Sequence, residues 1–456
     1  MKSRAYTSAF ALFCFVINSV LPAFAEEKAE EKQGPLQLPR VEASYHPPYY
    51  STTYEQPENP AEGQLQIGVT YTLWIPEGLK QVRGIIVHQH GCGEGSCKGS
   101  VTAAHDLHWQ ELARRNGGAL LGPSFHQVQA QNCRLWCDPR NGSSQVFTDS
   151  LKKLAELSGH PEVATAPWCL WGHSGGGFWS SLMQMQYPER IVAIWFQSGT
   201  AFGYWTKGEI EAPTIPEAAM QVPMMANPGF KEKGHERFRR AWDGSLAMFK
   251  AYRAKGAPIG FAPDPQTGHE TGDSRYLAIP FFDACLKLRL PDQVGSPLKK
   301  VDIEQGWLAP LNSEETPVPF DQYSGDKATA VWLPNQTVAL AWLDFVKTGT
   351  VGDQTPPPAP TNVKVDSKTG TITWNAGTDF ESGLQQFLVQ RDGKTIGQVP
   401  EKPTNRFGRP LFQNMSYGDT PVLPLLKFQF VDKAAEPGKA HQYEVISVNT
   451  AGLKSE

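Results

Sequence analysis

The regular alternation of short apolar runs with amphipathic stretches is the feature that most restricts how this sequence can fold. Runs typical of buried strands occupy residues 84–90, 119–125, 167–172 and 191–199, as GIIVHQH, ALLGPSF, PWCLWG and IVAIWFQSG. Stretches with the apolar spacing of helices separate them, and the alternation continues to about residue 348. Strand, helix and strand repeated at this pace build βαβ units, in which helices cover both faces of a mostly parallel sheet. We therefore predict one α/β domain over residues 64–350.

Residues 1–25 carry the pattern of a secretory signal peptide. A basic start, MKSR, precedes the apolar segment AFALFCFVINSVLPA and the small-residue cleavage signal AFA. No later run reaches the roughly 18 apolar residues of a membrane-spanning helix. We therefore expect an exported chain, secreted or periplasmic, without membrane insertion. The polar, aperiodic segment 26–63 is predicted to be an extended N-terminal arm.

The second half of the chain contains a weakly patterned region, a linker and a strand-rich segment. Strand and helix patterns fade over residues 291–335, which we interpret as a loop-rich cap of the α/β domain. Segment 351–359 contains three successive prolines and is predicted to be a semi-rigid linker. Beyond it, residues 360–456 show strand patterns without helical periodicity, as in an all-β sandwich.

The charge of the chain argues against one class of partner. The sequence has 42 basic and 46 acidic residues and a formal net charge of −4, with no basic stripe that could pair with phosphates. We therefore expect no nucleic-acid partner. The sequence indicates no cofactor and does not determine the oligomeric state.

The cysteines predict disulfide bonds. The sequence has seven, and removal of a signal peptide with Cys14 would leave six, an even number typical of bridged exported chains. Cys92 and Cys97, like Cys133 and Cys137, lie close together in sequence, so we expect two local bridges. Each would close a short loop and contribute about 2 kcal/mol in the entropic description of cross-links.

Alternatives remain open for some of these cysteines. The spacing of Cys133 and Cys137, with histidines nearby, could hold zinc, but no second ligand pair lies at zinc-finger spacing, so we do not expect a metal. Cys169 falls in a predicted strand and Cys285 in a predicted helix, where they form either a bridge or two buried thiols.

A glycine-rich turn after the strand at 167–172 holds a candidate nucleophile. The segment CLWGHSGGGFW places Ser174 in a Gly-x-Ser-x-Gly pattern that runs from Gly172 to Gly176, with a strand before it and a helix after it. A serine that points its hydroxyl out of such a turn needs a strained backbone, and flanking side chains would clash with the adjoining strand and helix. The glycines therefore favour a presented, reactive serine.

This pattern resembles the nucleophile turn of the α/β-hydrolase fold, and the resemblance covers about residues 64–348. It implies a serine, an acid and a histidine in that order along the chain, as nucleophile, orienting carboxylate and base. His269 lies in a loop after the last apolar strand, where that family has its base, and is our candidate. His235, which opens a helix, and His441, which lies in the second domain, fit less well.

Glu232 is the candidate acid that the resemblance implies. It lies three residues after the turn glycine that ends the preceding strand. The family usually has aspartate at this position. Asp243, in the next predicted helix, is the alternative. Asp264 and Glu270 lie too close to the candidate base in sequence to orient its ring easily.

The resemblance also implies a site that stabilises a developing oxyanion. The loop after the first buried strand reads HGCGEGSC, and its His90-Gly91 pair matches the His-Gly position of the family. The implied donors are the N–H of Cys92, or of Gly91, together with the N–H of Gly175. As alternatives, His88 and His90 are buried for packing or form a metal pair.

Segment 360–456 resembles a fibronectin type III module. Trp374 in TITWNAG matches the core tryptophan of an early strand, and Tyr443 matches the core tyrosine of the penultimate strand. The turn from Asn449 to Gly452 follows as in that family, but an insertion around residues 400–424 departs from it. Such a sandwich implies no catalytic machinery, so we expect a spacer or a weak surface binder.

Together these residues predict an exported serine hydrolase that cleaves carboxylic esters through an acyl-enzyme. Exported depolymerases and carbohydrate esterases combine similar domains, so the resemblance implies a polymeric or carbohydrate-linked ester, either on a polysaccharide or in a polyester. Aromatic side chains close to the turn either stack on the substrate or are ordinary core residues. They are Trp136, Trp179, Tyr204 and Trp205.

Two other functions fit parts of the pattern. A serine peptidase of the prolyl-oligopeptidase type shares the turn and the triad, but its propeller domain would give a repeat of about 40 to 50 residues, which this sequence lacks. A secreted binding or adhesion protein could use an inactive hydrolase scaffold. The presence of the serine, the histidine and the acid argues against that second alternative.

Overall fold

The computed structural model describes residues 47–93, 99–127, 131–311, 315–405, 409–413, 426–436 and 439–456. The predicted signal peptide, Cys97 and most of the predicted arm lie outside these residues. Within the described part of the chain, no helix is both long enough and apolar enough to cross a membrane.

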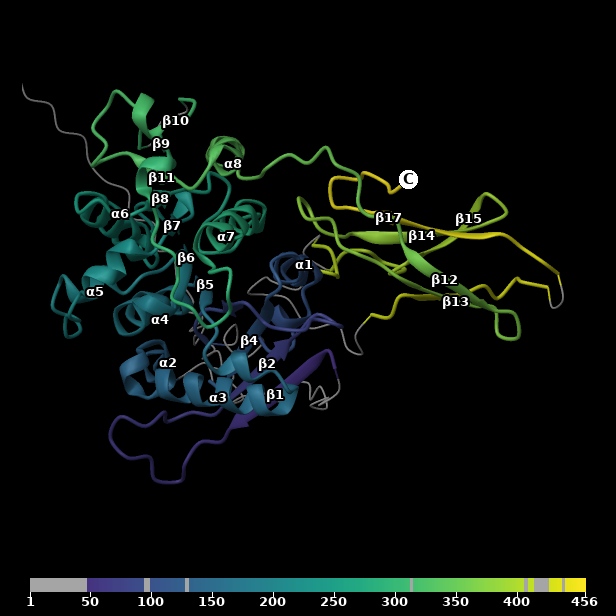
Figure 1. Ribbon diagram of the computed structural model, residues 1–456, viewed down its shortest axis with the longest axis horizontal. Helices are drawn as coiled ribbons and strands as arrows, with labels where there is room; N and C mark the ends of the chain where they lie inside the picture. The colour runs from purple at the N-terminus through teal and green to yellow at the C-terminus, as the bar shows by residue number, and fades with distance from the viewer. Residues whose placement is uncertain are drawn as a thin grey trace, which may run out of the picture. The chain divides into compact units, whose positions relative to one another are not determined.

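An eight-stranded sheet organises the first domain (Figure 1). Its strands are β1 (Tyr49–Tyr54), β2 (Val69–Trp74), β3 (Ile85–Gln89), β4 (Ala119–Phe125), β5 (Trp168–His173), β6 (Ile191–Gln197), β7 (Met224–Asn227) and β8 (Ile259–Phe261). Their order is β1-β2-β4-β3-β5-β6-β7-β8. Pairs β1–β2 and β2–β4 are antiparallel, and every other pair is parallel. Strand β1 lies in the segment that we expected to be an aperiodic arm, and it pairs with β2 at the edge of the sheet.

Helices cover both faces of this sheet. They are α1 (Leu107–Arg115), α2 (Arg134–Cys137), α3 (Ser143–Ser158), α4 (Gly175–Gln186), α5 (Phe202–Trp205), α6 (Arg239–Arg253), α7 (Arg275–Arg289) and α8 (Gln336–Thr348). Helix α7 contacts α1 and α8 on one face, and α3, α4 and α6 lie on the other (Figure 1). The predicted fold class, a mostly parallel sheet covered by helices as in α/β-hydrolases, is confirmed.

Burial explains why the strands read as continuous apolar runs. Every residue of β3 to β8 is buried, because helices cover both faces of the parallel part of the sheet. The carboxyl ends of these strands therefore lie at one edge, and the loops that follow them can meet there.

The region 291–335, expected to be a loop-rich cap, contains a small sheet of its own. Its strands, β9 (Trp307–Ala309), β10 (Val318–Pro319) and β11 (Val331–Leu333), pair in the order β10-β9-β11. Leu308, Ala330 and Trp332 form a separate apolar cluster there, and β11 contacts β8.

The C-terminal domain is all-β, as predicted. Strands β12 (Thr361–Asp366), β13 (Thr371–Asn375) and β16 (Gln429–Val431) form one antiparallel sheet in that order. Strands β15 (Lys394–Val399), β14 (Gln386–Arg391) and β17 (Tyr443–Val448) form the other. Trp374 lies in the core of this domain, whereas Tyr443 is only half-buried. Most of the predicted insertion lies outside the described residues, and the fibronectin type III identity stays a prediction.

Candidate active site

Ser174 lies in the turn between β5 and α4 with a backbone that non-glycine residues rarely adopt. Its φ and ψ are 52° and −112°, and its N–H donates to the carbonyl of Gln197 over 2.8 Å. Such conformations cost about 1 to 3 kcal/mol and persist only where the surroundings hold them. A Cβ on Gly172 would lie 2.3 Å from the carbonyl oxygen of Gly176, so the turn closes this tightly only with glycine. The residue types of the predicted turn therefore follow from its geometry.

The structure brings Ser174, His269 and Glu232 together in one line of hydrogen bonds, which we call the Ser-His-Glu array. The Nε2 atom of His269 lies 2.9 Å from Ser174 Oγ, and its Nδ1 atom lies 2.6 Å from Glu232 Oε1. An ionised carboxylate can only accept, so Nδ1 carries the proton and Nε2 is free to accept from the serine hydroxyl. This is the arrangement in which an imidazole can withdraw the hydroxyl proton.

Glu232 is held in a fully buried position. It ends the short 3₁₀ turn Phe230–Glu232 after β7, and its side chain has no exposed surface. Burial raises the pKa of its carboxyl group, while the hydrogen bond from His269 opposes that shift. The alternatives lie elsewhere: Asp243 is exposed on α6, and the ring of His235 accepts from nearby backbone N–H groups.

Two aromatic rings hold the imidazole of His269. The ring of Phe238 stacks on it with centroids 4.1 Å apart and planes 6° apart. The ring of His173 lies 5.1 Å away, and burial lowers the pKa of this histidine well below its usual value. A neutral His173 adds no positive charge beside the candidate base. Both contacts restrict the orientation of His269.

The residues predicted to form the oxyanion site surround Ser174. A Cβ on Gly91 would lie 3.1 Å from Ser174 Cβ, and a Cβ on Gly175 would lie 3.5 Å from the backbone nitrogen of Cys92. Gly175 is the first residue of α4, where backbone N–H groups have no acceptor within the helix. The amides of Cys92 and Gly175 are therefore close enough to act on one oxygen, and this role stays a prediction.

The neighbouring histidines lie in the interior, as the packing alternative expected. His88 is fully buried and stacks on Trp171 with centroids 3.9 Å apart. His90 is also buried, and its Nε2 atom lies 2.9 Å from Thr102 Oγ1. Burial lowers the pKa of His88 well below its usual value, so its ring is neutral.

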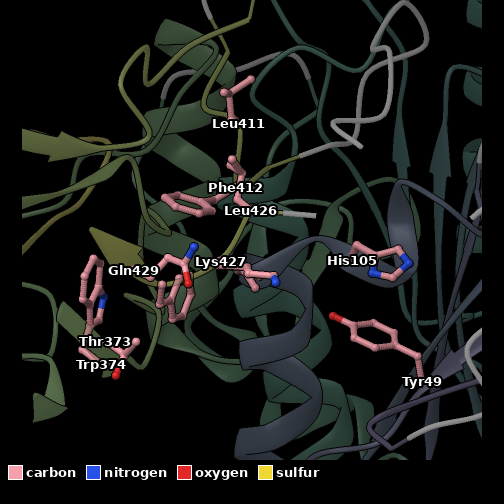
Figure 2. A pocket seen from close by; sticks show the side chains of 11 residues that line it. Tyr49, His105, Thr373, Trp374, Leu411, Phe412, Leu426, Lys427 and Gln429 are labelled. Atoms are coloured by element: carbon pink, nitrogen blue, oxygen red, sulfur yellow. The ribbon is translucent and has the colours of Figure 1, made fainter. Parts of the chain in front are cut away.

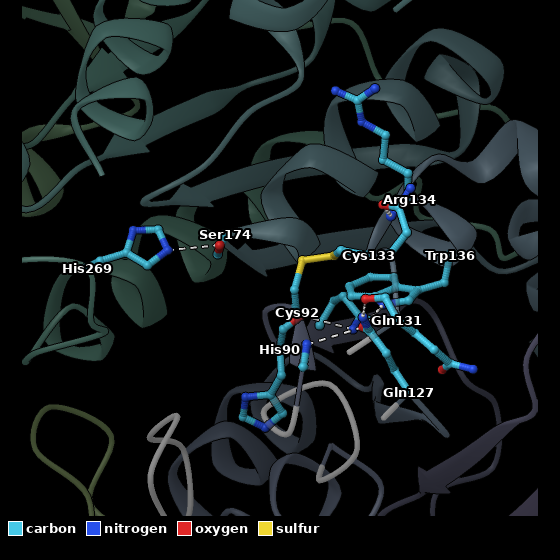
Figure 3. The surroundings of a disulfide bond; sticks show 12 residues. His90, Cys92, Gln127, Gln131, Cys133, Arg134, Trp136, Ser174 and His269 are labelled. Carbon is cyan, nitrogen blue, oxygen red and sulfur yellow. Dashed lines mark hydrogen bonds between the residues drawn. A yellow bond between two sulfur atoms is a disulfide. The ribbon is translucent and has the colours of Figure 1, made fainter. Parts of the chain in front are cut away.

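A disulfide joins Cys92 to Cys133, so both predicted local bridges are wrong (Figure 3). Cys97 lies outside the described residues, and Cys137 is a buried free thiol. Helix α2 packs against α4, which brings Cys133 to the loop after β3. Sequence spacing does not reveal this contact, because 41 residues separate the two partners. A loop of that length corresponds to about 4 kcal/mol in the entropic description.

The bridge lies directly against the start of α4. A Cβ on Gly175 would be 2.2 Å from the sulfur of Cys92 and 2.9 Å from that of Cys133. The sulfurs of Cys92, Cys133 and Cys137 lie within 4.8 Å of one another, but bridged sulfurs are not thiolates and cannot ligate zinc in that form. Cys169 and Cys285 are two buried thiols, the second of the predicted alternatives.

Ser174 and His269 line a pocket of about 340 Å³, and most of the predicted stacking residues do not. Trp136 is fully buried and stacks on Phe125 with centroids 4.4 Å apart. Trp179 and Trp205 are also buried in the core. These three side chains follow the core alternative, because large aromatic rings near the turn fill the space between helices and sheet. Tyr204 does line the pocket, and its role in substrate binding stays a prediction.

The pocket contains charged residues that the sequence analysis missed. Arg134, Arg237 and Arg240 line it together with Phe238, and we call these three arginines the arginine rim. The segment KEKGHERFRR, residues 231–240, carries the signal, since five of its ten residues are lysine or arginine.

A larger cavity, of about 490 Å³, lies elsewhere (Figure 2). Tyr49, His105, Trp374 and Phe412 are among the residues that line it. No member of the Ser-His-Glu array is among them, so cavity size alone does not identify the site.

Comparisons with known proteins give distant likenesses. No protein-family model and no curated protein matches the sequence. An S-formylglutathione hydrolase from Agrobacterium tumefaciens is 15% identical with a TM-score of 0.33, over 52% of this chain and 93% of that one. A thermostable carboxyl esterase from Bacillus coagulans is 12% identical with a TM-score of 0.34, over 52% and 99%. An acylaminoacyl peptidase from Pyrococcus horikoshii is 12% identical with a TM-score of 0.36, over 54% and 43%. At these values, none of them decides the activity of this chain.

Proposed function

We propose that this chain is a serine hydrolase that cleaves carboxylic esters through an acyl-enzyme. The observation that carries the proposal is the Ser-His-Glu array, with 2.9 Å between Ser174 Oγ and His269 Nε2 and 2.6 Å between His269 Nδ1 and Glu232 Oε1. The strained backbone of Ser174 supports it, because such strain gathers where a side chain must be presented.

The proposed reaction has two halves. In the first, His269 takes the proton of Ser174 while Oγ attacks the ester carbon, and the N–H groups of Cys92 and Gly175 stabilise the oxyanion. His269 then gives that proton to the leaving alcohol. In the second half, water attacks the acyl-serine with His269 again as base, which releases the acid and restores Ser174. Glu232 keeps the imidazole in the required tautomer throughout.

The setting of this activity is also a proposal. The signal-peptide pattern of residues 1–25 supports secretion or export to the periplasm. A polymeric or carbohydrate-linked substrate, with the C-terminal domain as a spacer or surface binder, fits an exported two-domain chain. A peptidase is less well supported, because the described side chains that line the pocket include no carboxylate that could hold a peptide amine.

Labelling with a fluorophosphonate, mapped by mass spectrometry, tests the proposal. We expect one adduct, on Ser174 and not on Ser198, which lines the same pocket. The Ser174→Ala variant should give none, while keeping the thermal unfolding curve of the parent protein. A well-folded parent protein that takes up no label at Ser174 would contradict the proposed mechanism.

A further inference from the structure

The side chains around the pocket differ in charge from the protein as a whole. The chain has a formal net charge of −4, yet the described residues that line the pocket include the three arginines of the rim and no aspartate or glutamate. They come from separate places in the sequence: Arg134 begins α2, Arg237 precedes α6, and Arg240 lies in its first turn. A local excess of positive charge is therefore built where a substrate would enter.

Most of this charge has no acidic partner among the residues that the structure describes. Arg240 pairs with Glu209 over 2.8 Å. Arg134 donates to the backbone carbonyl of Glu209 over 3.4 Å, and within the described residues neither Arg134 nor Arg237 forms an ion pair. Two guanidinium groups thus remain available to an anion in the pocket.

Aromatic rings hold these guanidinium groups near the array. Arg134 and Arg240 lie over the ring of Tyr204, 5.5 and 5.8 Å from its centroid. Arg237 lies 5.0 Å from the centroid of Phe238, which itself stacks on His269. A guanidinium held over a ring keeps its N–H edge free for a planar carboxylate. Figure 3 shows Arg134 next to the bridged Cys133.

From these contacts we infer that the pocket selects esters that carry an anionic group, such as a carboxylate, close to the ester bond. The inference rests on the proposed esterase function and names its substrate class. Arg134 and Arg237 bind the anion, and Arg240 with Glu209 forms the outer edge. The anion is on either the acyl part or the alcohol part of the ester, and an acidic polysaccharide or a polyester with free carboxylates would offer it.

Two matched pairs of esters distinguish an anion on the acyl part from an anion on the alcohol part. For the acyl part, 4-nitrophenyl hydrogen adipate is compared with the neutral 4-nitrophenyl hexanoate. For the alcohol part, 4-acetoxybenzoate is compared with its methyl ester. Rates are corrected with Ser174→Ala protein, and each variant is compared with the parent protein so that intrinsic reactivity cancels.

We expect Arg134→Gln and Arg237→Gln to lower kcat/KM for the anionic ester of at least one pair. This loss should be roughly tenfold larger than the loss for the neutral ester of the same pair, which is the size expected when a partly exposed, charge-assisted contact is removed. The loss should fall mainly on KM and should shrink as salt is added, because salt screens such pairs. Arg239→Gln is the matched control. Arg239 is exposed beside the rim and does not line the pocket, so we expect no change in either pair.

The outcomes separate this inference from the proposed function. Hydrolysis of the neutral esters with no differential loss in either rim variant would overturn the inference and leave the esterase proposal standing. An equally large differential loss in Arg239→Gln would also overturn the inference, because that loss would reflect the net charge of the protein alone. Failure to hydrolyse any of the four esters, with no fluorophosphonate label on Ser174, would overturn both.

Discussion

The Ser-His-Glu array and the arginine rim share one pocket and are built in opposite ways. Glu232 has no exposed side-chain surface and each polar contact of the array is short, whereas the side chain of Arg240 is 55% exposed. Bond-making chemistry gains from burial, because electrostatic interactions strengthen away from water. Recognition at an exposed edge is weaker per contact and tolerates change. Substitutions should therefore have large effects on the array and graded ones on the rim.

The largest effect is expected from Glu232→Gln. An amide can donate to His269 and hold the wrong tautomer, so we expect kcat to fall by roughly 10³- to 10⁴-fold. Steady-state kinetics with a neutral 4-nitrophenyl ester would measure it. Glu236→Gln, at an exposed glutamate four residues away, is the control and should change kcat less than twofold, on the order expected for surface positions. A similar loss in both variants would contradict the distinction between the buried array and its surroundings.

A smaller effect is expected from Cys133→Ser, because the bridge joins the two regions. Loss of the bridge should lower the free energy of unfolding by up to about 4 kcal/mol and let the Cys92 loop move. We expect kcat to fall about tenfold, less than the roughly 10²-fold or more for removal of a whole oxyanion donor. Urea unfolding and kinetics in the absence of reductant would measure both.

Cys137→Ser is the matched control for the bridge. Cys137 is the nearby free thiol, so its loss should cost much less stability and leave the Cys92–Cys133 bond detectable by mass spectrometry. Equal effects of the two variants would indicate that the sulfurs pair differently in solution.

The smallest effect concerns the dependence of stability on pH. Burial raises the pKa of Glu232 above its unfolded value of 4.5. At a pH between the unfolded pKa and the raised folded pKa of Glu232, the folded chain binds more protons than the unfolded chain. This carboxyl group therefore lowers the stability of the fold as pH rises. The Glu232→Gln variant should therefore gain thermal stability relative to the parent protein as pH rises. The difference in melting temperature, variant minus parent, should increase from below pH 4.5 through the folded pKa of Glu232. An opposite slope for Glu232→Gln would show that the hydrogen bond from His269 outweighs burial.

Local patterns predicted the fold and the turn at Ser174, and the family resemblance supplied the chain order of the array, whereas other contacts between distant segments were not predictable. The period of apolar residues shows βαβ units directly, and the glycines around Ser174 mark a turn whose geometry they permit. Chain order then limits the choice of His269 and Glu232. The partner of Cys92 depends on how α2 packs on α4, and whether Trp136 faces the core or the pocket depends on helix rotation. Neither is encoded in a local pattern, and the same holds for the pocket-facing side of the basic segment at 231–240.

The stacking of Phe238 on His269 gives this site a signal of its own. A phenyl ring 4.1 Å from an imidazole and nearly parallel to it shields the imidazole protons through its ring current. The carbon-bound protons of His269 should therefore resonate upfield of those of a histidine in the unfolded chain in a proton NMR spectrum. Any ligand that displaces Phe238 from this position would move that resonance. The site can thus be followed spectroscopically without a chromogenic ester and without turnover.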